Sequence, residues 1–431
     1  MSKFQIIVLA IFIVCIGIGI AVFATYRGNK NANTELAQIT VWGTFPAETF
    51  NKYIAEINQT LASPMKVSYV QKTPSTFSGD FIAALARGAG PDGILIPADM
   101  LMPHFDKLTL IPYTALPQRT FMDSYIGEGQ IYLTSDGIRA IPFIVDPLVM
   151  YWNKDMYGTA GIATYPKSWD EFKGLNKKLT VKDENGNIRK SAIAMGDFTN
   201  VVNSREILGT LLLQLGSQVT SFDQNGRFES ALIASDKSNP TGAVNFFTQF
   251  VNPNNENYSW NRGMNDSRTA FLSGTLATYF GFASELQSLR AKNANLNFDV
   301  AQIPQSKTNG VKTTYGKIYG LSIVRTSAKQ NDVYQSYAII TNPTNLKKLS
   351  EMTYLPSVNT SVIAGGSQDP YITIFNQAAL IARSWFDANA SESNKIFGNM
   401  INAVTSGAKN TAEALNDAND AYNVVLRQAQ Q

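Results

Sequence analysis

Hydrophobic positions between residues 38 and 96 follow two alternating patterns. Short apolar runs rich in β-branched residues, at 38–44, 66–70 and 91–96, have the length and composition of strands. Between them, apolar residues at 47–61 and 80–87 recur every three or four positions, as on one face of a helix. This order predicts a parallel α/β sheet, in which ligands bind beyond the carboxyl ends of the strands. The residues near those ends are Trp42, Thr44, Ser75, Thr76, Asp99 and Met100.

The stretch 136–172 combines several signals in a fixed order. A turn at Asp136-Gly137 precedes the apolar run 143–152, which Asp146-Pro147 interrupts. The residues that follow, 153–155, are expected to close this strand. Ser168-Trp169-Asp170-Glu171 then has the spacing of a capping box, which predicts the start of a helix.

The rest of the chain is expected to continue as an α/β fold. The turn 183–187 resembles the start of a calcium loop but lacks the later acidic ligand, so a hairpin turn is favoured. The chain has no Pro/Ser-rich linker, which favours lobes built from non-contiguous segments. Further strands are predicted at 275–280, 298–303 and 318–324, and helices at 207–215, 243–251, 332–340, 371–389, 395–406 and 411–427.

Residues 6–24 form an uncharged apolar segment between basic flanks. A helix of this length spans about 30 Å, the thickness of a bilayer core. We therefore expect a single-pass membrane anchor within residues 1–26 and a polar tether at 27–36, with the folded domain on the extracytoplasmic side. The alternative is a signal segment cleaved after 22–24, which would leave a secreted protein.

Composition places the rest of the chain among folded proteins. A length of 431 residues is too great for one ordinary core, and 44% hydrophobic with 16% charged residues is typical of globular domains. The net charge is only +3 and no basic cluster stands out, which argues against a nucleic-acid partner. The only cysteine is Cys15, so the chain beyond it cannot form an internal disulfide.

Motifs for catalysis and metal binding are missing from the sequence. His104 is the only histidine, on an expected surface loop, and no His/Cys cluster has metal-ligand spacing. No set of nucleophile and base can be assembled, so we expect no catalytic residue, no metal and no cofactor. Carboxylates such as Glu48, Asp99 and Asp146 leave a surface-anchored glycosidase open as an alternative.

Aromatic and acidic residues near strand ends give a different signal. Trp42, Asp99, Phe282 and Tyr315 lie near such ends, and Trp385 lies on a later predicted helix. Aromatic faces stack on sugar rings, and carboxylates accept hydrogen bonds from hydroxyl groups. Core packing is the alternative for any one aromatic residue, but several together favour a carbohydrate site.

Several segments occur in the order of a known family. Pro142, 151–155, Gly161-Ile162 and 166–172 follow one another, with weaker matches at 39–44, 89–93, Asp99, 271–274, Ala277 and 410–415. In this order they resemble the extracellular solute-binding proteins of bacterial ABC importers, of the maltose-binding-like kind. Three features depart from the family pattern: Trp152 replaces a Tyr, Phe282-Ala283 replaces a Trp, and the lipid-attachment cysteine is missing.

The resemblance implies a two-lobed periplasmic-binding-protein-like α/β fold of type II with a cleft between the lobes. It implies a first lobe of 37–146 plus 302–343 and a second of 147–301 plus 344–431, joined by a hinge at Val145, Asp146, Pro147, Gln302 and Ile303. The ligand residues carried over by position are Trp42, Thr44, Ser75, Asp99, Asp146, Phe198, Asn200, Gly281, Phe282, Tyr315, Gly316 and Trp385.

The function that the resemblance implies is solute capture. The lobes would close on a small solute, above all a sugar or oligosaccharide, and the protein would deliver it as a monomer to an ABC permease. It would not be an enzyme. A carbohydrate-active enzyme, or a receptor or sensor derived from a binding protein, stays as an alternative.

Overall fold

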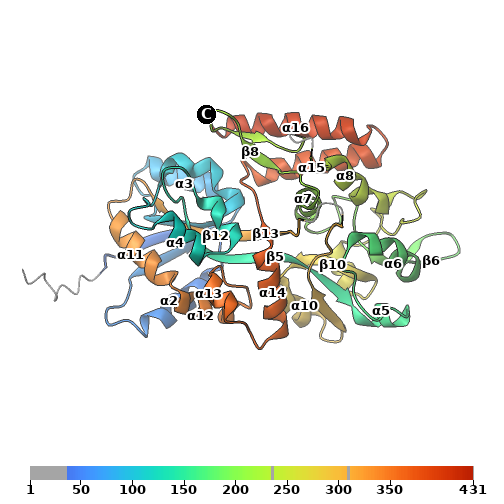
Figure 1. Cartoon of the computed structure of the whole chain (residues 1–431), viewed down its shortest axis with the longest axis horizontal. Helices are drawn as coiled ribbons and strands as arrows, with labels where there is room; N and C mark the ends of the chain where they lie inside the picture. Colours follow the sequence, from blue (N-terminus) through green and yellow to red (C-terminus); the bar gives the residue numbers. More distant parts are fainter. Residues whose placement is uncertain (1–35, 234–236, 308–310, 431) are drawn as a thin grey trace, which may run out of the picture.

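The computed structural model describes residues 36–233, 237–307 and 311–430. One mixed sheet follows the order β2-β1-β3-β12-β5-β10-β7-β6, and its strands connect two lobes that lie side by side (Figure 1). The predicted membrane segment 6–24 lies outside the described residues, as do 27–35 of the predicted tether. Within the described ranges, no helix has the length and apolar composition that a membrane crossing requires.

The first lobe contains the predicted parallel sheet. β1 (Ile39–Gly43) lies between β2 (Val67–Gln71) and β3 (Gly93–Pro97), and both pairings are parallel. α2 (Ala47–Asn58) and α3 (Phe77–Ala86) form the connections between these strands. The sequence therefore predicted this part of the fold correctly. α2 turns its apolar stripe inward and buries Phe50, Tyr53, Ile54 and Ile57.

The longest strand, β5 (Ile141–Asn153), links the two lobes. Its first half pairs with β12 (Thr314–Val324), and from Leu148 onward it pairs with β10 (Leu276–Phe282). The predicted strand over the apolar run 143–152 is confirmed, and it continues through Asp146-Pro147 and ends at Asn153. The carbonyl of Pro147 still accepts a hydrogen bond, from the N–H of Ala283 at 3.0 Å, so the proline removes only its own donor.

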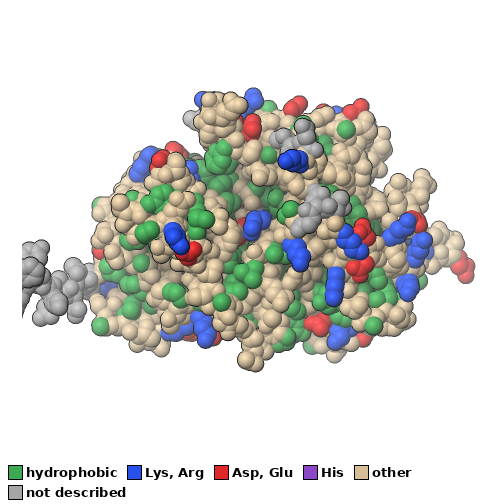
Figure 2. All heavy atoms as spheres, in the orientation of Figure 1, with side chains coloured by type: hydrophobic (Ala, Val, Ile, Leu, Met, Phe, Trp, Pro, Cys, Tyr) green, Lys and Arg blue, Asp and Glu red, His purple; other side chains and the backbone are tan. Residues whose placement is uncertain are grey.

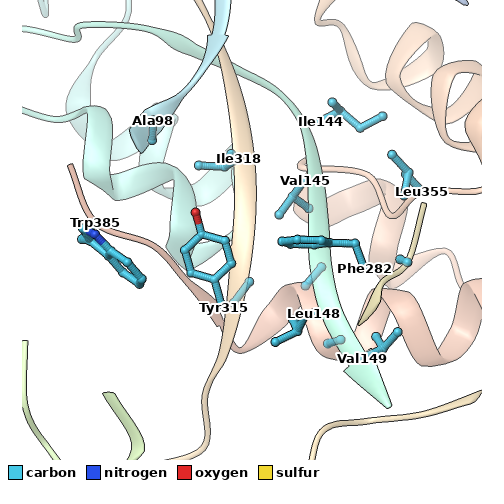
Figure 3. Packing of buried hydrophobic residues seen from close by; sticks show 14 of the residues in the cluster. Ala98, Ile144, Val145, Leu148, Val149, Phe282, Tyr315, Ile318, Leu355 and Trp385 are labelled. Carbon is cyan, nitrogen blue, oxygen red and sulfur yellow. The ribbon is translucent and has the colours of Figure 1, made fainter. Parts of the chain in front are cut away.

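The crossing of β5 and β12 lies in the hydrophobic core. Figure 3 shows Ile144, Val145 and Leu148 of β5 beside Phe282, with Ile318 on the neighbouring strand. These side chains are almost fully buried, so the region where β5 changes its strand partners is packed and apolar. Polar groups in this region therefore require specific partners.

The second lobe is built on β10 and its neighbours. Two local predictions are confirmed here: the N–H of Ser168 donates to the Glu171 carboxylate at 3.0 Å in a capping box, and Asp183 opens the hairpin turn between β6 and β7. No cluster of potential metal ligands occurs among the residues that the structure describes. The elements are β6 (Val181–Lys182), β7 (Ile188–Ile193), β11 (Phe298–Ala301), α5 (Lys154–Thr159), α6 (Phe172–Leu179), α7 (Ser204–Gln214), α8 (Pro240–Thr248), α9 (Ser267–Leu272) and α10 (Glu285–Lys292).

The C-terminal part is mostly helical, as expected, with two differences. The predicted helix 371–389 ends at Leu380, because the next residues form β13 (Ala382–Arg383) against β12. α12 (Pro343–Thr353) and α13 (Thr360–Ala364) pack on α2 and α4 of the first lobe, whereas the family resemblance implied that 344–431 belongs to the second lobe. The remaining elements are α4 (Gln118–Ser124), α11 (Gln330–Ile340), α14 (Pro370–Leu380), α15 (Ala390–Thr405), α16 (Thr411–Gln428), and a hairpin of β8 (Thr220–Phe222) and β9 (Phe228–Ser230).

His104 is buried, so the predicted surface position was wrong. Its ring lies 5.7 Å from Phe77 and 5.1 Å from Phe81 between ring centroids, and its Nε2 lies 3.1 Å from the Ser78 hydroxyl. Burial lowers the pKa of His104 to about 4, so the imidazole is neutral at physiological pH. Its surroundings indicate a structural residue of the first lobe.

Candidate ligand-binding site

A buried ion pair connects the two lobes. Asp99 lies in the short 3-10 helix Ala98–Met100 directly after β3, as expected for a residue beyond a strand end. Arg205 lies in the first turn of α7 in the second lobe, and its Nη2 donates to Asp99 Oδ2 at 2.9 Å. Both side chains are nearly inaccessible, with 7% of Arg205 and 6% of Asp99 exposed. Side chains from opposite lobes therefore meet at this point.

Further acidic groups surround the guanidinium of Arg205. Its Nη1 donates to Asp387 at 2.9 Å, and its Nε donates to Glu206 at 3.1 Å. Burial lowers the pKa of Arg205, but these carboxylates raise it by more, so the group stays charged. Burial also raises the pKa of Asp387, although Arg205 and the Ser393 hydroxyl oppose this effect. The cluster is thus polar and largely shielded from water.

Aromatic rings lie on one side of this cluster. Tyr315 of β12 donates its hydroxyl to Asp99 Oδ2 at 3.3 Å. The Tyr315 ring lies 5.0 Å from Trp385 and 6.0 Å from Phe282, and Figure 3 shows Tyr315 between these two residues. The structure therefore brings together four of the predicted ligand residues, which are Asp99, Phe282, Tyr315 and Trp385.

Two polar atoms of this cluster have no hydrogen-bond partner. Asp99 Oδ1 and Trp385 Nε1 are buried, and neither makes a hydrogen bond with the described residues. One is an acceptor and the other a donor, and a ligand hydroxyl group is able to serve both kinds. Leaving such groups unpaired costs free energy, so they are candidates for ligand contact.

Asp146 lies where β5 passes from one lobe to the other. Its Oδ1 accepts a hydrogen bond from the N–H of Ser284 at 3.0 Å, and it faces Lys317 in the register of β12. Burial raises the pKa of Asp146 to about 6, although the Ser284 hydrogen bonds and the charge of Lys317 oppose it. Val145 and Pro147 beside it are buried, whereas Gln302 and Ile303 lie beyond β11, where Gln302 donates to Gln377 at 2.8 Å.

The raised pKa of Asp146 predicts a dependence of stability on pH. The folded protein binds a proton at Asp146 more tightly than the unfolded chain, so this residue disfavours folding as the pH rises from about 4 to 6. We expect Asp146→Asn to gain stability relative to the wild type over that range, by up to about 1.4 kcal/mol per pH unit. Urea unfolding of both proteins at pH 4, 5, 6 and 7 measures the difference, and a difference independent of pH would contradict the prediction.

The other predicted ligand residues have varied positions. Ser75 is exposed in a loop, and Asn200 is held by Trp260, Asn261 and Met264, so neither contacts the cluster. Phe198 lines a hollow of about 320 Å³ together with Arg205 and Glu206.

The remaining residues of the set lie on strands or at their ends. The Lys72 ammonium lies 4.0 Å from the centroid of the Trp42 ring. The N–H of Thr44 donates a hydrogen bond to the carbonyl of Leu95 at 3.2 Å. Gly281 and Gly316 allow close packing, because a Cβ atom would lie 2.5 Å from Tyr279 and 2.6 Å from Ala382, respectively. Close packing therefore explains the presence of glycine at both positions without any ligand contact.

A cavity of about 600 Å³ lies beside the cluster. Its walls come from residues 130–133 of the first lobe, from the end of α7, from β8, and from 383–386, so Trp385 belongs to both the cavity and the cluster. Figure 2 shows hydrophobic side chains gathered in the recess between the part that carries α3 and the part that carries β8. The polar cluster therefore adjoins an open and partly apolar space.

Sequence reasoning missed Arg205, Glu206, Lys317 and Asp387. Arg205 and Glu206 directly precede the apolar run 207–215, and a charged pair at a helix start is normally a solvated first turn. An arginine next to nine residues without any charge was the available signal, because such a helix is largely buried.

This fold and the polar cluster between its lobes define a two-lobed binding protein. A sequence model of the bacterial extracellular solute-binding proteins matches residues 46–345. The chain belongs to this family.

Individual relatives are distant. A maltooligosaccharide ABC transporter solute-binding lipoprotein of Streptococcus pneumoniae is 23% identical over 291 residues, which cover 64% of this chain and 61% of that protein. The crystal structure of a cyclic α-maltosyl-1,6-maltose binding protein from Arthrobacter globiformis superposes with a TM-score of 0.74 at 18% identity, over 91% of this chain and 99% of that one. A cyclo/maltodextrin-binding protein complexed with maltotetraose gives a TM-score of 0.71 at 15% identity, over 91% and 97%. These likenesses show the fold.

Proposed function

We propose that this protein binds a carbohydrate between its two lobes and delivers it to an ABC permease on the extracytoplasmic side of a membrane. The observation that carries the proposal is the cluster of Asp99, Arg205, Tyr315 and Trp385, which combines buried charges, aromatic rings and unpaired polar atoms. Sugars offer hydroxyl groups for the polar atoms and apolar ring faces for the aromatic residues.

Lobe closure fits the same residues. Asp99 belongs to the first lobe and Arg205 to the second, so a ligand that contacts both would stabilise the closed arrangement. Residues around Asp146 and Pro147 would act as the hinge, because β5 exchanges its strand partners there. We propose that the protein acts as a monomer, and that residues 6–24 anchor it in the membrane.

Binding without catalysis is the favoured activity. A retaining or inverting glycosidase needs one carboxyl group that is free to donate a proton and another that attacks or activates water. Asp99 is fixed by Arg205 and Tyr315, and Asp146 accepts from the Ser284 amide. Glu48 is exposed at the start of α2, and no contact of its carboxylate with Asp99 or Asp146 occurs among the described residues.

Ligand titration tests the proposal. The full chain, purified in a detergent without a sugar headgroup, is titrated with maltose, maltotriose, maltotetraose, cellobiose and lactose, and binding is followed by calorimetry and by the melting temperature. We expect at least one sugar to bind with a 1:1 stoichiometry and to raise the melting temperature. Absence of binding to every sugar would contradict the proposal, and steady hydrolysis of a bound sugar would favour an enzyme.

A further inference from the structure

Lys317 occupies a central position that no sequence pattern indicated. It lies on β12 opposite Asp146 of β5, where the two lobes join. Its ammonium group lies 4.7 Å from the centroid of the Phe282 ring, and its side chain is only partly exposed. The Lys317 side chain therefore extends from β12 toward the aromatic residues of the site.

Acidic groups from three different elements act on this ammonium. They are Asp99 after β3, Asp146 on β5 and Glu206 on α7, so the first lobe, the crossing strand and the second lobe all contribute. Burial lowers the pKa of Lys317, but Tyr319 and these carboxylates raise it by more. The group is therefore a permanent cation at the point where the lobes meet.

The Lys317 ammonium nevertheless has no acceptor of its own. Among the described residues, no carboxylate lies within 4.0 Å of its Nζ and no oxygen accepts a hydrogen bond from it. Asp146, its cross-strand neighbour, instead accepts from Ser284. An ammonium group has three donors, and because the Lys317 side chain is partly exposed, these donors are accessible to a ligand between the lobes. A ligand is the natural source of the missing acceptors.

The charges around Lys317 limit which ligand fits. Asp99, Asp146, Glu206 and Asp387 are four carboxylates, whereas Arg205 and Lys317 are two cations. A ligand with its own carboxylate would enter a region that is already acidic, and like charges in a shielded site repel strongly. A neutral ring with several hydroxyl groups instead accepts from Lys317 and donates to the carboxylates.

We propose that Lys317 contacts the ligand, and that the carboxylates around it make the site selective for neutral, hydroxyl-rich sugars over sugar acids. The Lys317 ammonium donates to hydroxyl or ring oxygens of the sugar, and neighbouring hydroxyl groups donate to the free oxygen of Asp99. This proposal rests on the proposed function, since it assigns the selectivity of the same site.

The test compares two lysine variants of the full chain in the same detergent. Lys317→Met keeps an apolar stem over Phe282 and removes the charge. Lys182→Met is the matched control, because the Lys182 ammonium also lies 4.7 Å from an aromatic centroid, that of Tyr258, at a site away from the lobes' junction. For the neutral sugar that the wild type binds, we expect Lys317→Met to weaken binding tenfold or more and Lys182→Met to leave it unchanged.

Digalacturonic acid serves as the anionic probe, and we expect the wild type to bind it at least tenfold more weakly than the neutral sugar. Equal binding by Lys317→Met and the wild type, at equal melting temperatures without ligand, would overturn the role of Lys317 and leave the proposed function intact. Tighter binding of digalacturonic acid than of any neutral sugar would overturn the selectivity. Failure of the wild type to bind any probe would overturn the proposed function and this proposal with it.

Discussion

Arg205→Met is expected to lower the free energy of unfolding by about 3–5 kcal/mol, because it leaves Asp99 and Asp387 as buried charges without a counterion. Methionine retains most of the volume, so the loss reports on charge rather than on a cavity. The cost arises from desolvation of the carboxylates, since Asp387 is fully buried and Asp99 nearly so. Urea unfolding at pH 7, followed by intrinsic tryptophan fluorescence, measures the change.

Two comparisons make this result specific. Arg119→Met removes an arginine whose ion pair with Asp123 is 3.7 Å long and 94% exposed on the arginine side, so stability should be unchanged. The triple variant with Asp99→Asn, Arg205→Met and Asp387→Asn should recover part of the loss, since only Glu206, which is 14% exposed, then remains without its arginine partner. An Arg205→Met variant as stable as Arg119→Met would show that the cluster does not depend on its cation.

The sequence predicted the parts of the fold that depend on local patterns. The parallel strands of the first lobe, the capping box at Ser168 and the turn at Asp183 need only neighbouring residues, and all three are present. The predicted helix over 371–389 was wrong beyond Leu380, because a distant partner decides where it ends. β12 pairs with residues 382–383 and turns them into a strand, and it also holds β5 extended through Pro147.

The residues of the candidate site likewise include some that the sequence could predict and some that it could not. Asp99, Tyr315 and Phe282 were identifiable because each lies on or next to a strand end, where ligands bind in α/β sheets. Arg205 was not, since its partners are 106 residues earlier and 182 residues later in the chain. Lys317 shows a further limit: its position in β12 is a local property, whereas its central location between carboxylates follows from the packing of two lobes.

Gly209→Ala should lower stability in the wild type but raise it when Trp385 is replaced by alanine. A Cβ atom at Gly209 in α7 would lie 2.5 Å from Cη2 of Trp385, and its nearest neighbours are all atoms of that ring. Gly209→Ala alone should therefore push the indole out of its contact with Tyr315 and cost about 1–3 kcal/mol of stability. Trp385→Ala alone should cost about 3–5 kcal/mol, since it empties a site that is 4% exposed.

In the Trp385→Ala background the obstacle to a methyl group at Gly209 is gone. Gly209→Ala should then stabilise the protein by up to about 1 kcal/mol, because alanine favours a helix interior over glycine. Gly174→Ala in α6 is the matched control: no atom lies within 4 Å of its Cβ position, so its effect should be the same in both backgrounds. Urea unfolding of the four Gly209/Trp385 combinations gives the coupling energy. Additive effects of the two substitutions would mean that α7 and the Trp385 ring do not touch as described, and that the wall of the site between them is looser than the structure shows.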